Sequence, residues 1–182
     1  MERNPLESMG LVAAERLGDL HREAGQVDAA RQTWAALRRR LESLDRGHPM
    51  LAPTVNTLAQ LALGAADLVQ AERLGRLALS ACDEDGSRVH MMLSTALLAA
   101  QRPAEASAHT ARALDPSPTE PPMLTAEIHF RHAEASYANG DSTTAVRSGS
   151  RAWAILEGPG AAEPRAQIQR WTAARGLTLE ER

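Results

Sequence analysis

The stretch GHPMLAPTVNTLAQLALGAADLVQAERLGRLALS, residues 47–80, has the pattern of two helices joined by a short turn. Apolar residues recur at helical spacing in both halves, first at Leu58, Ala59 and Ala62 and then at Ala71, Leu74, Leu77 and Ala78. Between them, Gly64 is free to leave the helical conformation, and Asp67 can cap the second helix. We therefore predict a helix-turn-helix unit whose two helices are separated by a break at residues 63–67.

The same pattern occurs four times along the chain. Each copy has a small residue in the first helix and another one twelve positions later, in the second helix. The pairs are Gly18 and Ala30, Ala59 and Ala71, Ser94 and Ala106, and Ala133 and Ala145. Small side chains let two antiparallel helices approach closely. A recurring helix pair of this kind is the sequence signature of a repeat protein.

These residues resemble the tetratricopeptide repeat (TPR) family, whose second helix carries Ala, then a large residue, then a further Ala. The matching segments are 30–37, 71–78, 106–113 and 145–152, although Gly75 and Gly149 stand where the family has the large residue. Gly47-His48-Pro49 is similar to the longer-period variant found in kinesin light chains and bacterial regulatory proteins. The resemblance covers about residues 10–156 and implies a right-handed superhelix of helix pairs.

We accordingly expect an all-α, TPR-like solenoid that forms a single domain over residues 1–182. The expected repeats are residues 5–46, 47–85, 87–118 and 122–157, followed by a capping helix at 163–176. The proline-rich stretch 115–122 is interpreted as a loop between repeats, with a hinge as the alternative.

Composition argues against several classes of function. The net charge is −3 among 20 basic and 23 acidic residues, which disfavours a surface that tracks nucleic-acid phosphates. The single cysteine, Cys82, excludes an internal disulfide and fits a reducing compartment. No apolar run approaches the length of a membrane span, and the first residues do not resemble a secretory signal. We expect a soluble, cytoplasmic protein that needs no membrane.

The sequence contains no recognisable catalytic or cofactor-binding motif, so we expect a protein that is not an enzyme and has no cofactor. His129 and His132 lie one turn apart and could share a metal ion. They also fall where the repeat pattern expects an aromatic residue and a leucine, and we interpret them as half-buried rings rather than metal ligands. The acidic segment 83–85 lacks the spacing of a calcium-binding loop and is interpreted as solvated.

The resemblance implies that the first helices of the repeats line a concave groove that binds a peptide. The residues expected to face this groove are Glu15, Asp19, Arg22, Asn56, Gln60, Arg88, Met91, Thr95, Leu98, Glu127, Phe130, Glu134 and Tyr137. Amide side chains can bond a peptide backbone, arginine can pair with a carboxylate, and Met and aromatic residues can hold apolar side chains. The lysines of the family's carboxylate clamp are absent, and the acidic residues favour a ligand with some basic character.

We therefore predict a non-catalytic scaffold or adaptor that binds a protein or an extended peptide. The alternatives are a sensory or regulatory module that binds a signalling peptide or a small ligand, and an accessory subunit of an enzyme complex. Self-association stays open.

Overall fold

The structure is a computed structural model that describes residues 5–45, 47–82, 86–114, 121–158 and 160–180. Over these ranges the chain forms nine α-helices and no β-strand. It divides into two compact units, residues 1–84 and residues 85–182. Within the described ranges no helix combines the length and the apolar character needed to cross a membrane.

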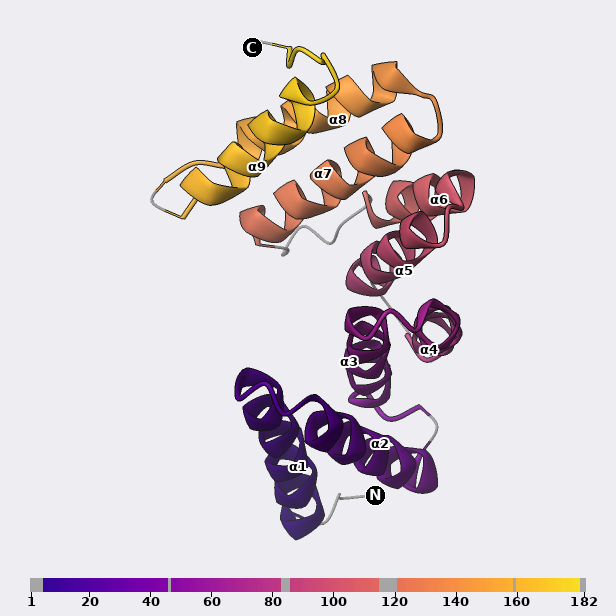
Figure 1. The fold of residues 1–182 in the computed structure, drawn as a ribbon. Helices are drawn as coiled ribbons and strands as arrows, with labels where there is room; N and C mark the ends of the chain where they lie inside the picture. The colour runs from indigo at the N-terminus through magenta and orange to yellow at the C-terminus, as the bar shows by residue number, and fades with distance from the viewer. Residues whose placement is uncertain (1–4, 46, 83–85, 115–120, 159, 181–182) are drawn as a thin grey trace. The chain divides into compact units, whose positions relative to one another are not determined.

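The first unit contains two helix pairs. These are α1 (Pro5–Glu23) with α2 (Val27–Leu44), and α3 (Leu51–Gly64) with α4 (Leu68–Ser80) (Figure 1). Helix α2 also packs against α3 and joins the two pairs. The expected acidic loop at 83–85 lies outside the described residues.

The second unit contains two further pairs and a last helix. The pairs are α5 (Ser87–Ala99) with α6 (Pro103–Ala113), and α7 (Pro122–Ala138) with α8 (Ser142–Ile155). Helix α9 (Ala162–Ala173) follows at the expected place of the capping helix (Figure 1). Helix α7 packs against both α5 and α6, so the two pairs on either side of the proline-rich stretch belong to one unit.

The small residues that defined the repeats lie at the helix contacts. Seven of the eight have no exposed surface, namely Ala30, Ala59, Ala71, Ser94, Ala106, Ala133 and Ala145. The eighth, Gly18, is buried against Trp34. A Cβ atom at Gly18 would lie 2.6 Å from the Nε1 atom of Trp34, which is closer than any side chain tolerates. The predicted register of all four pairs is therefore confirmed.

The turns between paired helices share one backbone geometry, and in the second repeat its left-handed residue is not the glycine expected to leave the helix. Gly64 is the last residue of α3, and it is Ala66 that adopts a left-handed φ of 58°. The corresponding residues of the other pairs are Gly25 (φ 70°), Gln101 (φ 58°) and Gly140 (φ 86°). Each lies seven positions after the first small residue of its repeat.

A single hydrogen bond explains why these turns are alike. The residue after each left-handed position donates its backbone N–H to the carbonyl five residues earlier. The donors are Gln26, Asp67, Arg102 and Asp141, with distances of 2.8–3.0 Å. This is the Schellman arrangement that ends a helix. Asp67 then caps α4 as expected, accepting the N–H of Gln70 at 3.1 Å, and Asp141 caps α8 by accepting that of Thr144 at 2.9 Å.

Exchanging the residue types in the second turn tests this geometry. A left-handed φ costs alanine free energy that glycine does not pay, so we expect Ala66→Gly to raise the free energy of unfolding by about 0.5–1 kcal/mol. Nothing lies within 4 Å of a Cβ atom added at Gly64, and Gly64→Ala should leave stability unchanged or raise it slightly. Urea denaturation measures both changes. Destabilisation by Gly64→Ala would place the left-handed residue at Gly64 instead.

Candidate functional site

The predicted groove residues of the first unit lie on α1 and α3. Asp19 accepts a hydrogen bond from Arg22 at 3.1 Å, so these two side chains partly neutralise each other. Glu15 is half-buried and Gln60 is exposed. Asn56 is only 8% exposed, and its Oδ1 atom has no hydrogen-bond partner among the described residues.

The predicted residues of α5 belong to the second unit. Arg88 is exposed and forms no ion pair within the described part of the chain. Met91 and Leu98 are half-buried, each packed against a small buried cluster. The hydroxyl of Thr95 donates to the carbonyl of Met91 at 3.0 Å. The four side chains follow one another at helical spacing, so α5 presents a charge, a hydroxyl and two apolar groups on one stripe.

The predicted residues of α7 are divided between the surface and the contact with α9. Glu127 is exposed, and Glu134 accepts a hydrogen bond from Arg131 at 2.8 Å. Phe130 is 5% exposed and meets the ring of Trp171 edge-on, at 5.7 Å between ring centroids. Tyr137 meets the same ring at 5.8 Å. Both aromatic side chains therefore hold α9 against α7, a role that the sequence analysis had not assigned to them.

A pocket of about 260 Å³ lies between α7 and α9, beside these aromatic residues. Two of the predicted residues, Glu127 and Phe130, line it together with Met123 and Ile168. The pocket thus combines an apolar floor with the exposed carboxylate of Glu127, which forms no ion pair within the described residues, and with the side chain of Arg131, which pairs with Glu134. It can accept an apolar side chain whose neighbour carries a positive charge.

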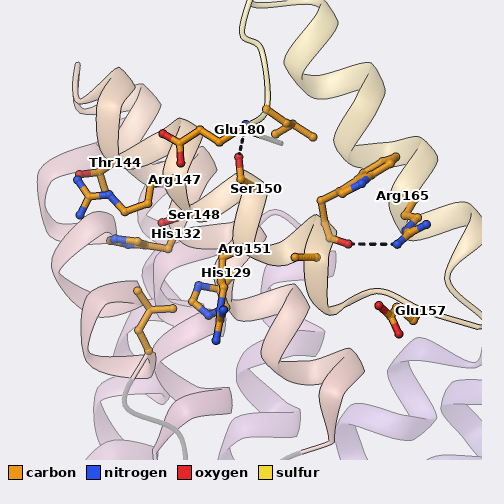
Figure 2. A pocket seen from close by; sticks show the side chains of 14 residues that line it. His129, His132, Thr144, Arg147, Ser148, Ser150, Arg151, Glu157, Arg165 and Glu180 are labelled. Atoms are coloured by element: carbon orange, nitrogen blue, oxygen red, sulfur yellow. Dashed lines mark hydrogen bonds between the residues drawn. The ribbon is translucent and has the colours of Figure 1, made fainter. Parts of the chain in front are cut away.

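A larger pocket, of about 870 Å³, was not predicted from the sequence. It lies mainly along α8, with walls from α7, α9 and the C-terminal segment 177–180 (Figure 2). Its polar lining consists of His129, His132, Thr144, Arg147, Ser148, Ser150, Arg151, Glu157, Arg165 and Glu180. Only the two histidines had been considered as site residues.

The three arginines of this larger pocket differ in their surroundings. Arg147 and Arg151 are exposed, one helical turn apart on α8, and neither forms an ion pair within the described ranges. Arg165 lies with its guanidinium 4.9 Å from the centroid of the Trp153 ring and donates to the Trp153 carbonyl at 3.5 Å. Arg165 is therefore held in place, whereas Arg147 and Arg151 remain available to a ligand (Figure 2).

The two histidines form the opposite wall. His132 is buried, and its Nδ1 atom lies 2.9 Å from the hydroxyl of Thr110. Burial lowers the pKa of His132, against a smaller opposing effect of Asp141. Burial, Arg151 and His132 together lower the pKa of His129 to about 4, and its Nδ1 atom has no hydrogen-bond partner among the described residues. Both rings are therefore neutral near neutral pH.

The described residues contain no group of three or more His, Cys, Asp or Glu side chains that could hold a metal ion. His132 instead packs as a buried ring bonded to Thr110, and His129 as a half-buried ring beside Arg151. Their packing agrees with the interpretation of these histidines as rings that replace other residues of the repeat.

The C-terminal segment closes one side of the larger pocket. A Cβ atom at Gly149 would lie 3.3 Å from Cδ2 of Leu179, so Leu179 occupies the space that a large residue would fill in a TPR second helix. The backbone N–H of Glu180 donates to the hydroxyl of Ser150 at 2.8 Å. The missing large residue at Gly149 was visible in the sequence and was the available signal for this contact.

The lowered pKa of His129 determines how stability changes with acidity. The unfolded chain binds a proton at this side chain near the ordinary pKa of 6.5, whereas the folded chain binds it only near 4. The free energy of unfolding should therefore fall as the pH drops through this window, and His129→Gln should make the fall shallower. Urea denaturation across the window and an NMR titration of the ring measure both effects. A pKa of 6.5 or above would contradict the burial of this imidazole.

Neither a protein-family model nor a curated protein sequence matches this chain. Solved structures do match it. BtubC (BKLC) from P. vanneervenii superposes with a TM-score of 0.70 and 17% identity, over 100% of this chain and 70% of that chain. Two structures of MamA superpose with TM-scores of 0.60 and 0.59 at 14% identity, over 94% and 88% of this chain and 98% and 94% of theirs.

At such low identity these likenesses bear on the fold alone. The matched structures are helical repeats of the TPR type, and the superpositions extend over nearly the whole of this chain. With the four helix pairs and their buried small residues, they confirm the prediction from the sequence. The chain has an all-α, TPR-like helical-repeat fold.

Proposed function

We propose that the chain is a non-catalytic protein-binding scaffold or adaptor that takes an extended peptide along α5 and α7. TPR-like repeats present their first helices as a continuous binding surface. Here α5 and α7 pack against each other within the second unit, so their exposed side chains can act on one ligand. The residues on α1 and α3 would provide a surface of the same kind in the first unit.

The observation that carries this proposal is the pocket between α7 and α9. An extended peptide needs at least one deep contact for a side chain, and this pocket provides an apolar one beside the exposed carboxylate of Glu127. A peptide with an apolar residue next to a basic one fits both features. Along α5, Arg88 could pair with an acidic group of the peptide, while Met91 and Leu98 contact apolar side chains.

Helix α1 provides further support for a protein-binding role. Leu6, Met9, Leu17 and Leu20 are 48–77% exposed and lie within one narrow stripe of the helix. The side of α1 that packs on α2 is a different one, around Leu11 and Gly18. Exposed apolar stripes on soluble proteins are more often interaction surfaces than neutral surface.

Charge reversal at Glu127 tests the proposed binding mode. Peptides would first be selected from a displayed random library on the intact chain, and their affinities measured by fluorescence polarisation. We expect the selected peptides to carry a basic residue beside an apolar one, and Glu127→Lys to weaken them at least about tenfold, or about 1.4 kcal/mol. Arg88→Glu should also weaken those peptides that carry an acidic residue.

The matched control is Glu23→Lys, because Glu23 is exposed on α1 and forms no ion pair within the described residues. It makes the same change in net charge and should alter affinity less than twofold. The melting temperatures of all variants should match that of the unmodified chain. Equal losses of affinity for Glu127→Lys and Glu23→Lys would show that the net charge of the chain, and not the position of Glu127, causes the effect. Failure to select any peptide would refute the proposal.

A further inference from the structure

We propose that the larger pocket along α8 is a second binding site, which takes the phosphate or carboxylate group of a small anionic molecule. This site lies along α8, the second helix of the last repeat, whereas the proposed peptide surface lies along α5 and α7, which are first helices. Its lining shares no residue with the pocket that contains Glu127. The two sites can therefore be tested separately.

The positive charge of the site comes from Arg147 and Arg151. Residues four apart in a helix lie on the same face, and both side chains line the pocket, Arg147 beside Thr144 and Arg151 beside His129 (Figure 2). Each offers a planar set of N–H donors that matches the geometry of two oxygens of a phosphate or carboxylate. Two exposed arginines without an ion pair in the described chain leave a site that an anion would neutralise.

Both α7 and α8 supply uncharged donors. His129 projects from α7 beside Arg151, and the hydroxyls of Thr144 and Ser148 lie on the side of Arg147 (Figure 2). A neutral imidazole keeps one N–H donor, and a hydroxyl can donate to an oxyanion without adding charge. The Nδ1 atom of His129 is buried and has no hydrogen-bond partner in the described residues.

The acidic residues that line the site do not cancel its charge. Glu157 and Glu180 line the pocket against three arginines, and neither forms an ion pair with them. The lining residues therefore keep a net positive charge while both histidines are neutral. Asp141, at the start of α8, does not line the pocket, but its carboxylate accepts the N–H of Thr144 and interacts electrostatically with Arg147.

The size and walls of the pocket favour a small molecule over a polypeptide. Sites for small ligands measure about 300–1,000 Å³, and this pocket is about 870 Å³. Residues of three helices and the 177–180 segment line it, and Leu179 and Glu180 lie against α8 at Gly149 and Ser150.

Calorimetric titration of the intact chain with inorganic pyrophosphate and, separately, with citrate tests the site. We expect at least one probe to bind at one equivalent with a dissociation constant below about 1 mM. Arg147→Gln and Arg151→Gln should each weaken that probe at least fivefold. Arg39→Gln is the matched control, because Arg39 is exposed on α2, forms no ion pair in the described chain and carries the same charge. It should change affinity less than twofold.

NMR signals of the imidazole rings locate the binding. Addition of the bound probe should shift the ring signals of His129 and His132 and leave that of His21, in the first unit, unchanged. Binding of pyrophosphate alone would identify a phosphate site, and binding of citrate alone a carboxylate site. The proposal is overturned if neither probe binds, if Arg39→Gln weakens binding as much as the pocket variants do, or if the ring signals of His129 and His132 stay fixed. Glu127→Lys, which tests the peptide surface, should leave probe affinity unchanged.

Discussion

Close contact between paired helices at small side chains is the constraint on which the rest of the structure depends. At each of the four crossings the residues of both helices are buried, and at Gly18 even one added carbon would collide with Trp34. Close approach fixes the spacing of the helices, and that spacing sets which residues of the first and second helices remain at the surface. Both candidate sites depend on this helix spacing. The proposed peptide surface consists of the exposed side chains of the first helices. The proposed anion pocket consists of side chains of α8 that remain exposed between α7 and α9.

The repeat pattern was sufficient to predict the helices and their pairing, because packing residues recur at fixed spacing and are visible in the sequence. It was not sufficient for the turn of the second repeat. Glycine is the residue that most readily adopts a left-handed φ, so Gly64 was the natural choice, yet the structure uses Ala66. The hydrogen bond from Asp67 to the carbonyl of Ala62 requires the left-handed residue at that position whatever its type. Gln101 occupies the same position in the third repeat for the same reason.

The sites were less predictable than the fold, because each depends on elements outside the repeat pattern. Phe130 and Tyr137 are predicted groove residues, and both also pack against Trp171 of α9, a contact that the repeat pattern does not predict. The anion pocket needs Arg147 and Arg151 together with a C-terminal segment that folds back onto α8. No periodicity in the sequence connects Leu179 with Gly149, and only the absence of a large residue at Gly149 marked the place. Contacts of this kind, between segments far apart in the sequence, follow no sequence period and are visible only in the folded chain.

Overpacking of one helix crossing is the most direct test of this account. Ala106 is fully buried on α6, as is Ser94 on its partner helix α5, whereas Ala111 is exposed on α6. If close approach at small residues holds the pairs together, Ala106→Leu should lower the free energy of unfolding by about 1–3 kcal/mol in urea denaturation, and Ala111→Leu should change it by less than about 0.5 kcal/mol. An Ala106→Leu variant as stable as the unmodified chain would show that the helices do not meet at these residues and would contradict the architecture described above.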